Sequence, residues 1–149
     1  VAATPNVTDR VYHSVALLLP DGRVMTGGGN PQRTVNELRL EIYSPAYMSK
    51  YRPVIQSAPS KLSYGKSFTI QTSQASNIKW VHLIKPMATT HTYDTEQRLV
   101  DLPIISRTSS SLTVTLTSKN NLAPVGWYML FITDNNEVPS VASWIQIPS

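Results

Sequence analysis

The sequence predicts an all-β fold, and three observations lead to that prediction. Almost every apolar run in the 149 residues is short, rich in β-branched or aromatic side chains, and bounded by Gly, Pro, Asn, Asp or Ser. No window of helical length carries a convincing 3.6-residue period of apolar side chains. Eleven prolines are spread through the chain, and they oppose long helices.

The first part of the chain predicts a hairpin and a third strand. Residues 14–19 and 23–26 lie on either side of Pro20-Asp21-Gly22, a strong signal for a hairpin turn. Residues 38–43 follow the glycine-rich segment 27–31 and alternate with period two, as a half-buried strand does. One propeller blade, of the kind that kelch-type repeats of about 50 residues form, has this order of elements: strand, turn, strand, glycine triplet, loop and strand.

The second part predicts a sandwich of two sheets. After prolines interrupt the pattern between residues 43 and 59, about seven short strands follow at the spacing of about 8–12 residues that is typical of an immunoglobulin-like domain. The clearest are expected at 67–72, 78–84, 111–117, 127–133 and 143–147. We therefore divide the chain into an incomplete last blade, residues 1–45, and an immunoglobulin-like domain, residues 46–149. Since a propeller needs about four to eight blades, we interpret the chain as the tail of a larger protein.

Composition excludes several classes of function. The 13 basic and 9 acidic residues give a net charge of +4, and the cations stand singly rather than in the cluster that a nucleic-acid binder needs. No stretch approaches the roughly 20 apolar residues of a membrane span. The chain has no cysteine, which excludes disulfides, thiolate metal sites and cysteine nucleophiles. We expect neither a nucleic-acid nor a membrane partner.

Two of the three histidines are candidate metal ligands. His82 lies within an apolar strand pattern and is expected to be structural. His13 follows Tyr12 directly, and neighbouring side chains of a regular strand point to opposite faces. Both can therefore reach one metal only if the backbone turns or bulges at that point. The alternative is a tyrosine packed in a core beside a histidine on the surface.

His91 is the other candidate, in the polar, Thr-rich segment Met87–Arg98. This segment is too irregular for a strand and is expected to be a long loop, the kind of segment that carries functional residues on rigid scaffolds. The alternative is a solvated loop without a site. Two imidazoles and a phenol would suit Cu(II) by ligand type.

Several segments together resemble the C-terminal part of the galactose oxidase and glyoxal oxidase family of copper radical oxidases. The resemblance covers nearly the whole chain, in order. The segments are Arg10-Val11-Tyr12-His13-Ser14, residues 17–24, Gly27-Gly28-Gly29-Asn30-Pro31, residues 90–98, 126–131 and 138–143.

The resemblance implies a copper (Cu2+) centre in the complete parent protein. Tyr12 matches the family's axial tyrosine, which acts as general base, and His13 and His91 match its two equatorial histidines. The family oxidises primary alcohols or aldehydes with O2 and releases H2O2, with the help of a radical tyrosine that is cross-linked to a cysteine. This Tyr-Cys cofactor is expected in the parent and is absent from this chain, so the chain alone is expected to be inactive.

The resemblance also implies the setting of the site. The C-terminal domain is expected to be an E-set domain, an immunoglobulin-like sandwich, and the preceding propeller blades of the same parent are its expected partners. The expected substrate is a small alcohol, aldehyde or carbohydrate, and the expected location is secreted or extracytoplasmic. We expect Tyr12, His13 and His91 to converge only when a complete propeller holds the blade.

Two other functions remain open at the level of sequence. One is a non-catalytic sandwich module of the same lineage that binds carbohydrate or protein. Its binding face would contain some of the aromatic residues Trp80, Tyr93, Trp127 and Trp144, although we expect most of them to pack in the core. The other is a structural domain whose parent has lost the copper chemistry.

Overall fold

The computed structural model describes residues 10–30, 32–91 and 93–149. Strands dominate these residues, and their only helices are two short 3-10 turns, η1 (Ala46–Ser49) and η2 (Ala75–Asn77). The all-β prediction is therefore confirmed. Neither helical turn in the described ranges is long and apolar enough to cross a membrane.

The N-terminal strands form a small antiparallel sheet that we call the blade, residues 10–43. Its strands are β1 (Ser14–Leu18), β2 (Val24–Gly28) and β3 (Leu40–Tyr43), paired in the order β1-β2-β3. The predicted hairpin turn joins β1 to β2: the Gly22 amide donates to the Leu19 carbonyl at 2.8 Å, and Gly22 takes a φ of +86° that favours glycine.

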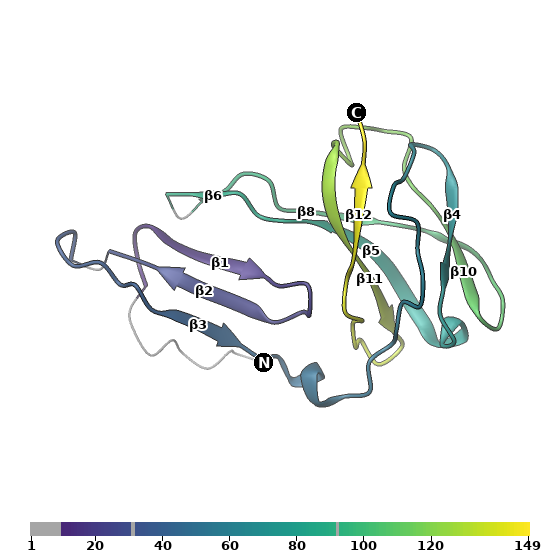
Figure 1. Ribbon diagram of the computed structural model, residues 1–149, viewed down its shortest axis with the longest axis horizontal. Helices are drawn as coiled ribbons and strands as arrows, with labels where there is room; N and C mark the ends of the chain where they lie inside the picture. The colour runs from purple at the N-terminus through teal and green to yellow at the C-terminus, as the bar shows by residue number, and fades with distance from the viewer. Residues whose placement is uncertain (1–9, 31, 92) are drawn as a thin grey trace.

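The C-terminal strands form two packed sheets that we call the sandwich, residues 52–147 (Figure 1). One sheet has the order β4-β10-β9, formed by β4 (Ser67–Gln71), β10 (Ser111–Thr115) and β9 (Ile104–Arg107). The other has the order β12-β11-β5-β8, formed by β12 (Ser143–Ile147), β11 (Gly126–Asp134), β5 (Ile78–Lys85) and β8 (Arg98–Asp101). These seven strands agree with the number expected from the spacing of turn signals. The border between residues 45 and 46 stays a prediction.

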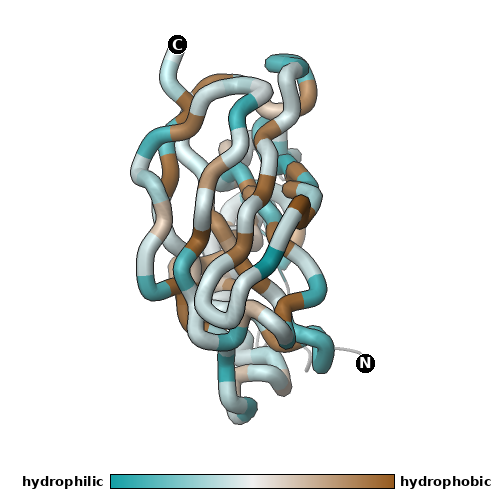
Figure 2. The backbone as a smooth tube through the Cα atoms, turned by 90° about the vertical axis from the view of Figure 1, so that its right-hand side faces the viewer, coloured by the Kyte–Doolittle hydropathy of each residue, from teal (hydrophilic) through white to brown (hydrophobic). Residues whose placement is uncertain are grey.

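The core lies between the two sheets of the sandwich. Hydrophobic and hydrophilic segments alternate along its strands (Figure 2), and the inward residues of β11, Tyr128, Leu130 and Ile132, are fully buried. Each large aliphatic side chain buried in this way contributes about 1.5–3 kcal/mol. The Tyr128 hydroxyl donates to the Pro124 carbonyl at 2.6 Å, so its polar atom is satisfied at the edge of the core.

A hairpin projects from the sandwich and extends beside β1 (Figure 1). We call residues 86–97 the finger; its strands are β6 (Thr89–Thr90) and β7 (Tyr93–Asp94). The expectation of a loop too irregular for strands was wrong here. Polar side chains hold this hairpin: Asp94 Oδ1 accepts from the amides of Ala88, Glu96 and Gln97, at 3.0–3.2 Å.

Several apolar side chains are exposed on the blade and the sandwich. On β3 and the residues before it, Leu38, Leu40 and Ile42 point to solvent, as expected for a blade that lacks a neighbour. The aromatic side chains expected mostly in the core are also accessible, which corrects that expectation. They are Trp80, Tyr93, Trp127 and Trp144.

Candidate metal centre

Tyr12, His13 and His91 come together in the structure. The ring centroids lie 4.0 Å apart for Tyr12 and His13, 5.1 Å for His13 and His91, and 6.0 Å for Tyr12 and His91. The first two residues belong to the blade and the third to the finger. The expectation that they converge only within a complete propeller is therefore wrong, since the chain itself brings the three rings together.

A tight turn lets two sequence neighbours face the same point. The Ser14 amide donates to the Val11 carbonyl at 3.1 Å, and His13 has a φ of 64°, in the left-handed region. This turn immediately precedes β1, so the strand alternation that would separate Tyr12 from His13 does not apply. Tyr12 is 51% exposed, so it is not the core tyrosine of the alternative interpretation.

Hydrogen bonds from the end of β2 and the loop after it hold this turn in place. The Asn30 amide donates to the Tyr12 carbonyl at 2.7 Å. Arg10, whose side chain is only 4% exposed, donates from Nη1 to the Gly28 carbonyl and pairs with Glu41 at 2.7 Å. The buried cation thus ties the segment before the turn to β2 and β3 at once.

His91 lies at the tip of the finger, also with a left-handed backbone, at a φ of 51°. Histidine tolerates this region better than most residues, but the conformation still stores strain of about 1 kcal/mol or more, and such strain gathers at functional sites. The Thr90 hydroxyl lies 2.8 Å from His91 Nδ1. This contact fixes the ring and leaves Nε2 as the nitrogen that is free to bind a metal.

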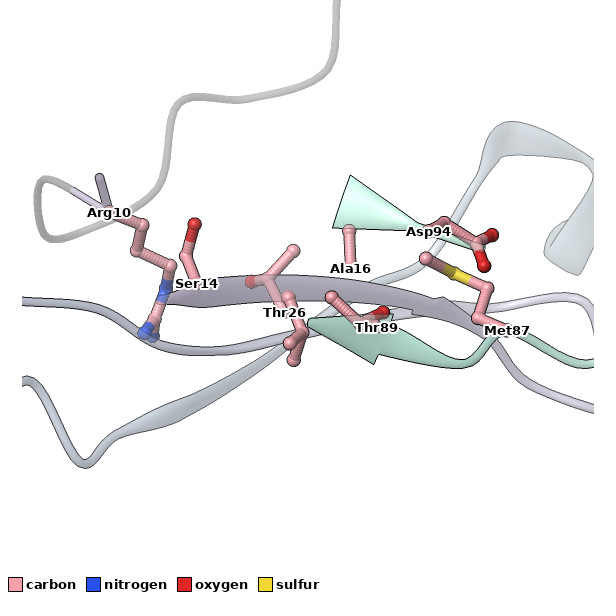
Figure 3. Close-up of a pocket in the computed structure, with 8 residues that line it drawn as sticks. Arg10, Ser14, Ala16, Thr26, Met87, Thr89 and Asp94 are labelled. Carbon is pink, nitrogen blue, oxygen red and sulfur yellow. The ribbon is translucent and has the colours of Figure 1, made fainter. Parts of the chain in front are cut away.

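An open pocket of about 270 Å³ lies between the finger and the blade (Figure 3). Blade and finger side chains face one another across it: Arg10, Ser14, Ala16 and Thr26 from the blade, and Met87, Thr89 and Asp94 from the finger. The finger is therefore not densely packed against the blade along its length.

A second cleft gives access to two of the candidate ligands, Tyr12 and His13. It is a cleft of about 690 Å³, and its lining residues are Val11, Tyr12, His13, Asn30 and Arg33. Four of these five lining residues carry polar groups, and the cleft is large enough to admit a small molecule.

The donor set fits copper. Two imidazole nitrogens and one phenol oxygen are ligands that Cu(II) accepts, and no soft thiolate is required. Across the described residues, no three His, Cys, Asp or Glu side chains gather to hold a metal. The candidate site differs from such clusters because its third donor is a tyrosine.

His82 lies outside this group, on the outward face of β5. Its Nε2 is 3.5 Å from Asp101 Oδ1 on β8. Burial lowers the pKa of His82, and the nearby Asp101 carboxylate opposes that shift. His82, Tyr47 and Phe131 are among the residues that line one small cavity, in agreement with a structural role for His82.

Sequence reasoning overlooked Thr90 and Asn30 as supporting residues. Asn30 acts through its backbone amide, and because nearly every residue has such an amide, the residue type does not reveal this role. Its position directly after the glycine triplet was the only indication in the sequence. Thr90 had one available signal: a hydroxyl residue adjacent to a candidate histidine ligand can fix the imidazole.

Comparison with known proteins identifies the sandwich. Residues 52–147 match the family described as galactose oxidase-like, early set domain. The matched range begins at Arg52 and ends at Ile147.

Similarity to whole proteins extends over nearly the entire chain. An aldehyde oxidase (GLOX) of Vitis pseudoreticulata is 35% identical over an alignment that covers 97% of this chain and 31% of that protein. A galactose oxidase of Gibberella zeae is 36% identical, with coverage of 96% and 22%.

A solved structure is also similar to this chain over nearly its entire length. A fungal alcohol oxidase of the AA5 family, in complex with copper, superposes with a TM-score of 0.87 at 32% identity and covers 98% of this chain. This chain corresponds to 33% of that protein, so it spans a third or less of each of these three relatives.

Proposed function

Because the chain belongs to the galactose oxidase and glyoxal (aldehyde) oxidase family, as its C-terminal E-set region, we propose that it is the C-terminal portion of a copper radical oxidase. In this proposal three of its side chains would hold the copper: Tyr12, His13 and His91. The observation that carries the proposal is the convergence of these three rings from two separate parts of the chain.

The proposed reaction converts a primary alcohol and O2 to an aldehyde and H2O2, or an aldehyde, water and O2 to a carboxylic acid and H2O2. Bound copper would supply a Lewis acid and a one-electron acceptor. The two imidazoles would hold the metal, and the Tyr12 oxygen would take the proton of the substrate hydroxyl, as a general base. Its exposure on the open cleft supports this role, because a substrate can reach it.

The remainder of the active site is proposed to come from the parent protein. A two-electron oxidation needs a second one-electron centre, and the family's Tyr-Cys radical cofactor requires a cysteine that this chain lacks. The chain alone is therefore proposed to be inactive.

We also propose the partners and location of the parent. The exposed side chains of Leu38, Leu40 and Ile42 support contact with a preceding propeller blade, since burial of such a face stabilises a propeller. The substrate is proposed to be a small alcohol, aldehyde or carbohydrate, and the parent is proposed to be secreted or extracytoplasmic, as a family resemblance suggests.

Calorimetric titration with Cu(II) tests the ligand assignment. We expect His91→Ala to weaken binding by about tenfold or more, since even residues that only support metal ligands have effects of that size. His82→Ala is the matched control, because it removes a histidine that lies outside the cluster. Equal affinity in the wild-type chain and in His91→Ala would remove His91 from the site.

A peroxide-coupled assay tests the remainder of the proposal. The parent with its upstream blades is expected to produce H2O2 from alcohol or aldehyde and to lose this activity in Tyr12→Phe. The chain alone is expected to produce none, and robust turnover by the chain alone would contradict its assignment as one portion of the catalytic unit.

A second candidate function is carbohydrate binding by the sandwich. Trp127 and Trp144 lie diagonally on adjacent strands of one sheet face, and they are 53% and 46% exposed. Neighbouring exposed indoles are suited to stacking on sugar rings. Loss of binding to a glycan panel in both Trp127→Ala and Trp144→Ala, with binding retained in Trp80→Ala, would favour this function.

A further inference from the structure

Two described hydrogen bonds join the blade to the sandwich, and one of them comes from the side chain of Arg52. Its Nη1 donates to the Asp21 carbonyl at 2.7 Å, in the turn between β1 and β2. Its Nε donates to the Pro139 carbonyl at 2.8 Å and its Nη2 to the Ser140 carbonyl at 2.6 Å, both in the segment between β11 and β12. One guanidinium therefore joins backbone groups of the two parts.

Further contacts reinforce this cluster. The Arg52 guanidinium carbon lies 5.8 Å from the centroid of the Tyr47 ring, and the Tyr47 hydroxyl donates to the Gly22 carbonyl. The Ala142 amide donates to the Pro20 carbonyl at 2.8 Å. We call this cluster the latch: the side chains of Tyr47 and Arg52 with the backbone of residues 20–22 and 139–142.

Glycine at position 22 allows the close approach. A Cβ built on Gly22 would lie 3.2 Å from the Tyr47 hydroxyl and 3.3 Å from Arg52 Nη2, closer than ordinary van der Waals contact. The turn residue predicted from sequence thus also brings the β1–β2 turn against the latch side chains.

The latch and the candidate metal centre lie at opposite ends of the same strands. In the blade, β1 separates the latch turn from His13. In the sandwich, Pro139 pairs with Thr133, which pairs with Trp80 near the start of β5, whereas the finger follows Lys85 at its other end. A small rotation at the latch therefore displaces the distant ring cluster.

We infer that Arg52 is a positioning residue for the metal centre: it orients the blade against the sandwich and thereby sets the separation of His13 and His91. This inference rests on the proposed function. The five residues of β1 span about 17 Å, so a rotation of about 5° at the latch moves the far end by about 1.5 Å. Metal–ligand distances tolerate only about 0.2 Å.

Arginine is suited to this role in a way that lysine is not. Its planar guanidinium offers five N–H donors in fixed directions, and the three carbonyls of the latch accept from three different nitrogens. A lysine retains the charge but provides a single ammonium group on a flexible stem. Arg52→Lys therefore removes the orientation while it preserves the attraction.

Arg107→Lys is the matched control. Arg107 also donates to two backbone carbonyls, those of Ala75 and Ile78, but both lie within the sandwich. Its substitution disturbs a comparable contact without altering the junction with the blade.

The first measurement needs no metal. Because the chain has no cysteine, spin labels can be introduced at Thr34→Cys in the blade and Lys119→Cys in the sandwich, both at exposed positions. We expect the distance distribution between them to widen in Arg52→Lys and to stay unchanged in Arg107→Lys. A pair within the sandwich, Ser109→Cys with Lys119→Cys, should not change in either variant.

The second measurement is Cu(II) affinity. We expect Arg52→Lys to bind about tenfold more weakly than the wild-type chain, and His91→Ala to cause little further loss in that background. An unchanged distance distribution together with a full His91 effect in Arg52→Lys would overturn the inference. Wild-type binding that does not depend on His91 would instead overturn the proposed function, and the label distances alone would then decide whether Arg52 orients the blade.

Tyr47→Phe covers the case in which Arg52→Lys does not fold. It removes one hydroxyl and its hydrogen bond to the Gly22 carbonyl but retains the ring beneath the guanidinium. A smaller widening of the blade–sandwich distance is expected, and a distribution identical to that of the wild-type chain would count against the latch.

Discussion

Gly28 and His13 lie so close that no other residue fits at position 28 without a shift. Gly28 has a φ of +66°, and a Cβ built on it would lie 2.8 Å from the carbonyl oxygen of His13. The glycine therefore allows β2 to approach the turn that presents the first histidine. The glycine triplet has a structural role at the site although it has no side chain there.

Gly28→Ala should destabilise the protein by more than Gly65→Ala. Both glycines have nearly the same φ, +66° and +67°, but a Cβ at Gly65 meets only Ser118, at 3.5 Å. Gly65→Ala should cost about 1–2 kcal/mol, the cost of a left-handed alanine. Thermal unfolding measures the difference, and Gly28→Ala alone should also weaken Cu(II) binding. Equal losses of stability would show that the contact with His13 has no energetic effect.

Thr90→Val should reduce Cu(II) affinity, whereas Thr90→Ser should not. The hydroxyl 2.8 Å from His91 Nδ1 fixes the imidazole, and valine has nearly the same shape without the oxygen. Loss of such a supporting contact lowers metal affinity by about 10–100-fold in other sites. Titration calorimetry on the two variants provides the comparison. Similar Cu(II) affinities in Thr90→Val and Thr90→Ser would show that the hydroxyl does not support metal binding.

Asp94→Ala should disorder the finger. Amide hydrogen exchange should show lost protection at Glu96 and Gln97, whose N–H groups donate to this carboxylate, and Asp101→Ala serves as a control outside the finger. Unchanged protection in Asp94→Ala would mean that the hairpin does not depend on this carboxylate.

Protonation of Asp94 at low pH should also disorder the finger. Burial raises the pKa of Asp94, but the three amide hydrogen bonds more than offset this effect, and the net result is a pKa below the usual 3.8. The stabilisation is therefore complete above pH 3.8 and is lost as the pH falls through the lowered value. A carboxyl resonance of Asp94 that titrates above pH 3.8 would contradict this prediction.

Stability should also decline as the pH falls below 6.5 because of His82. Burial lowers the pKa of His82 in the folded chain, so the unfolded chain binds the proton more readily. The stability present above the usual value of 6.5 is lost as the pH falls toward the lowered native pKa. His82→Gln should flatten the dependence of melting temperature on pH between neutral pH and about 5. An identical slope in both proteins would assign the effect to other groups.

Local patterns predicted most of the fold correctly. The turn at Pro20-Asp21-Gly22 depends on residues adjacent in sequence, and the alternation along β10 directly reflects which side chains face the core. The finger was not predicted as a hairpin because its sequence lacks an apolar alternation. Its two short strands are instead supported by side-chain hydrogen bonds of Asp94 and Thr95.

For the candidate site, the sequence could predict which residues belong to it but not that they lie together in space. Tyr12, His13 and His91 were identified from resemblance, but their convergence depends on how the blade is oriented. That orientation involves hydrogen bonds from Arg52 to backbone carbonyls. Because every residue has a backbone carbonyl, the sequence does not indicate which ones accept these bonds.

The latch has a consequence for the order of events during synthesis. The acceptor at Asp21 leaves the ribosome early, but the carbonyls of Pro139 and Ser140 leave it only when the sandwich is nearly complete. Domains emerge from the N-terminal side during translation. The candidate ligands Tyr12 and His13 therefore lack this orienting contact until almost the last strand has been synthesised. A nascent chain arrested before residue 139 would contain Tyr12, His13 and His91 and still lack the junction that aligns them.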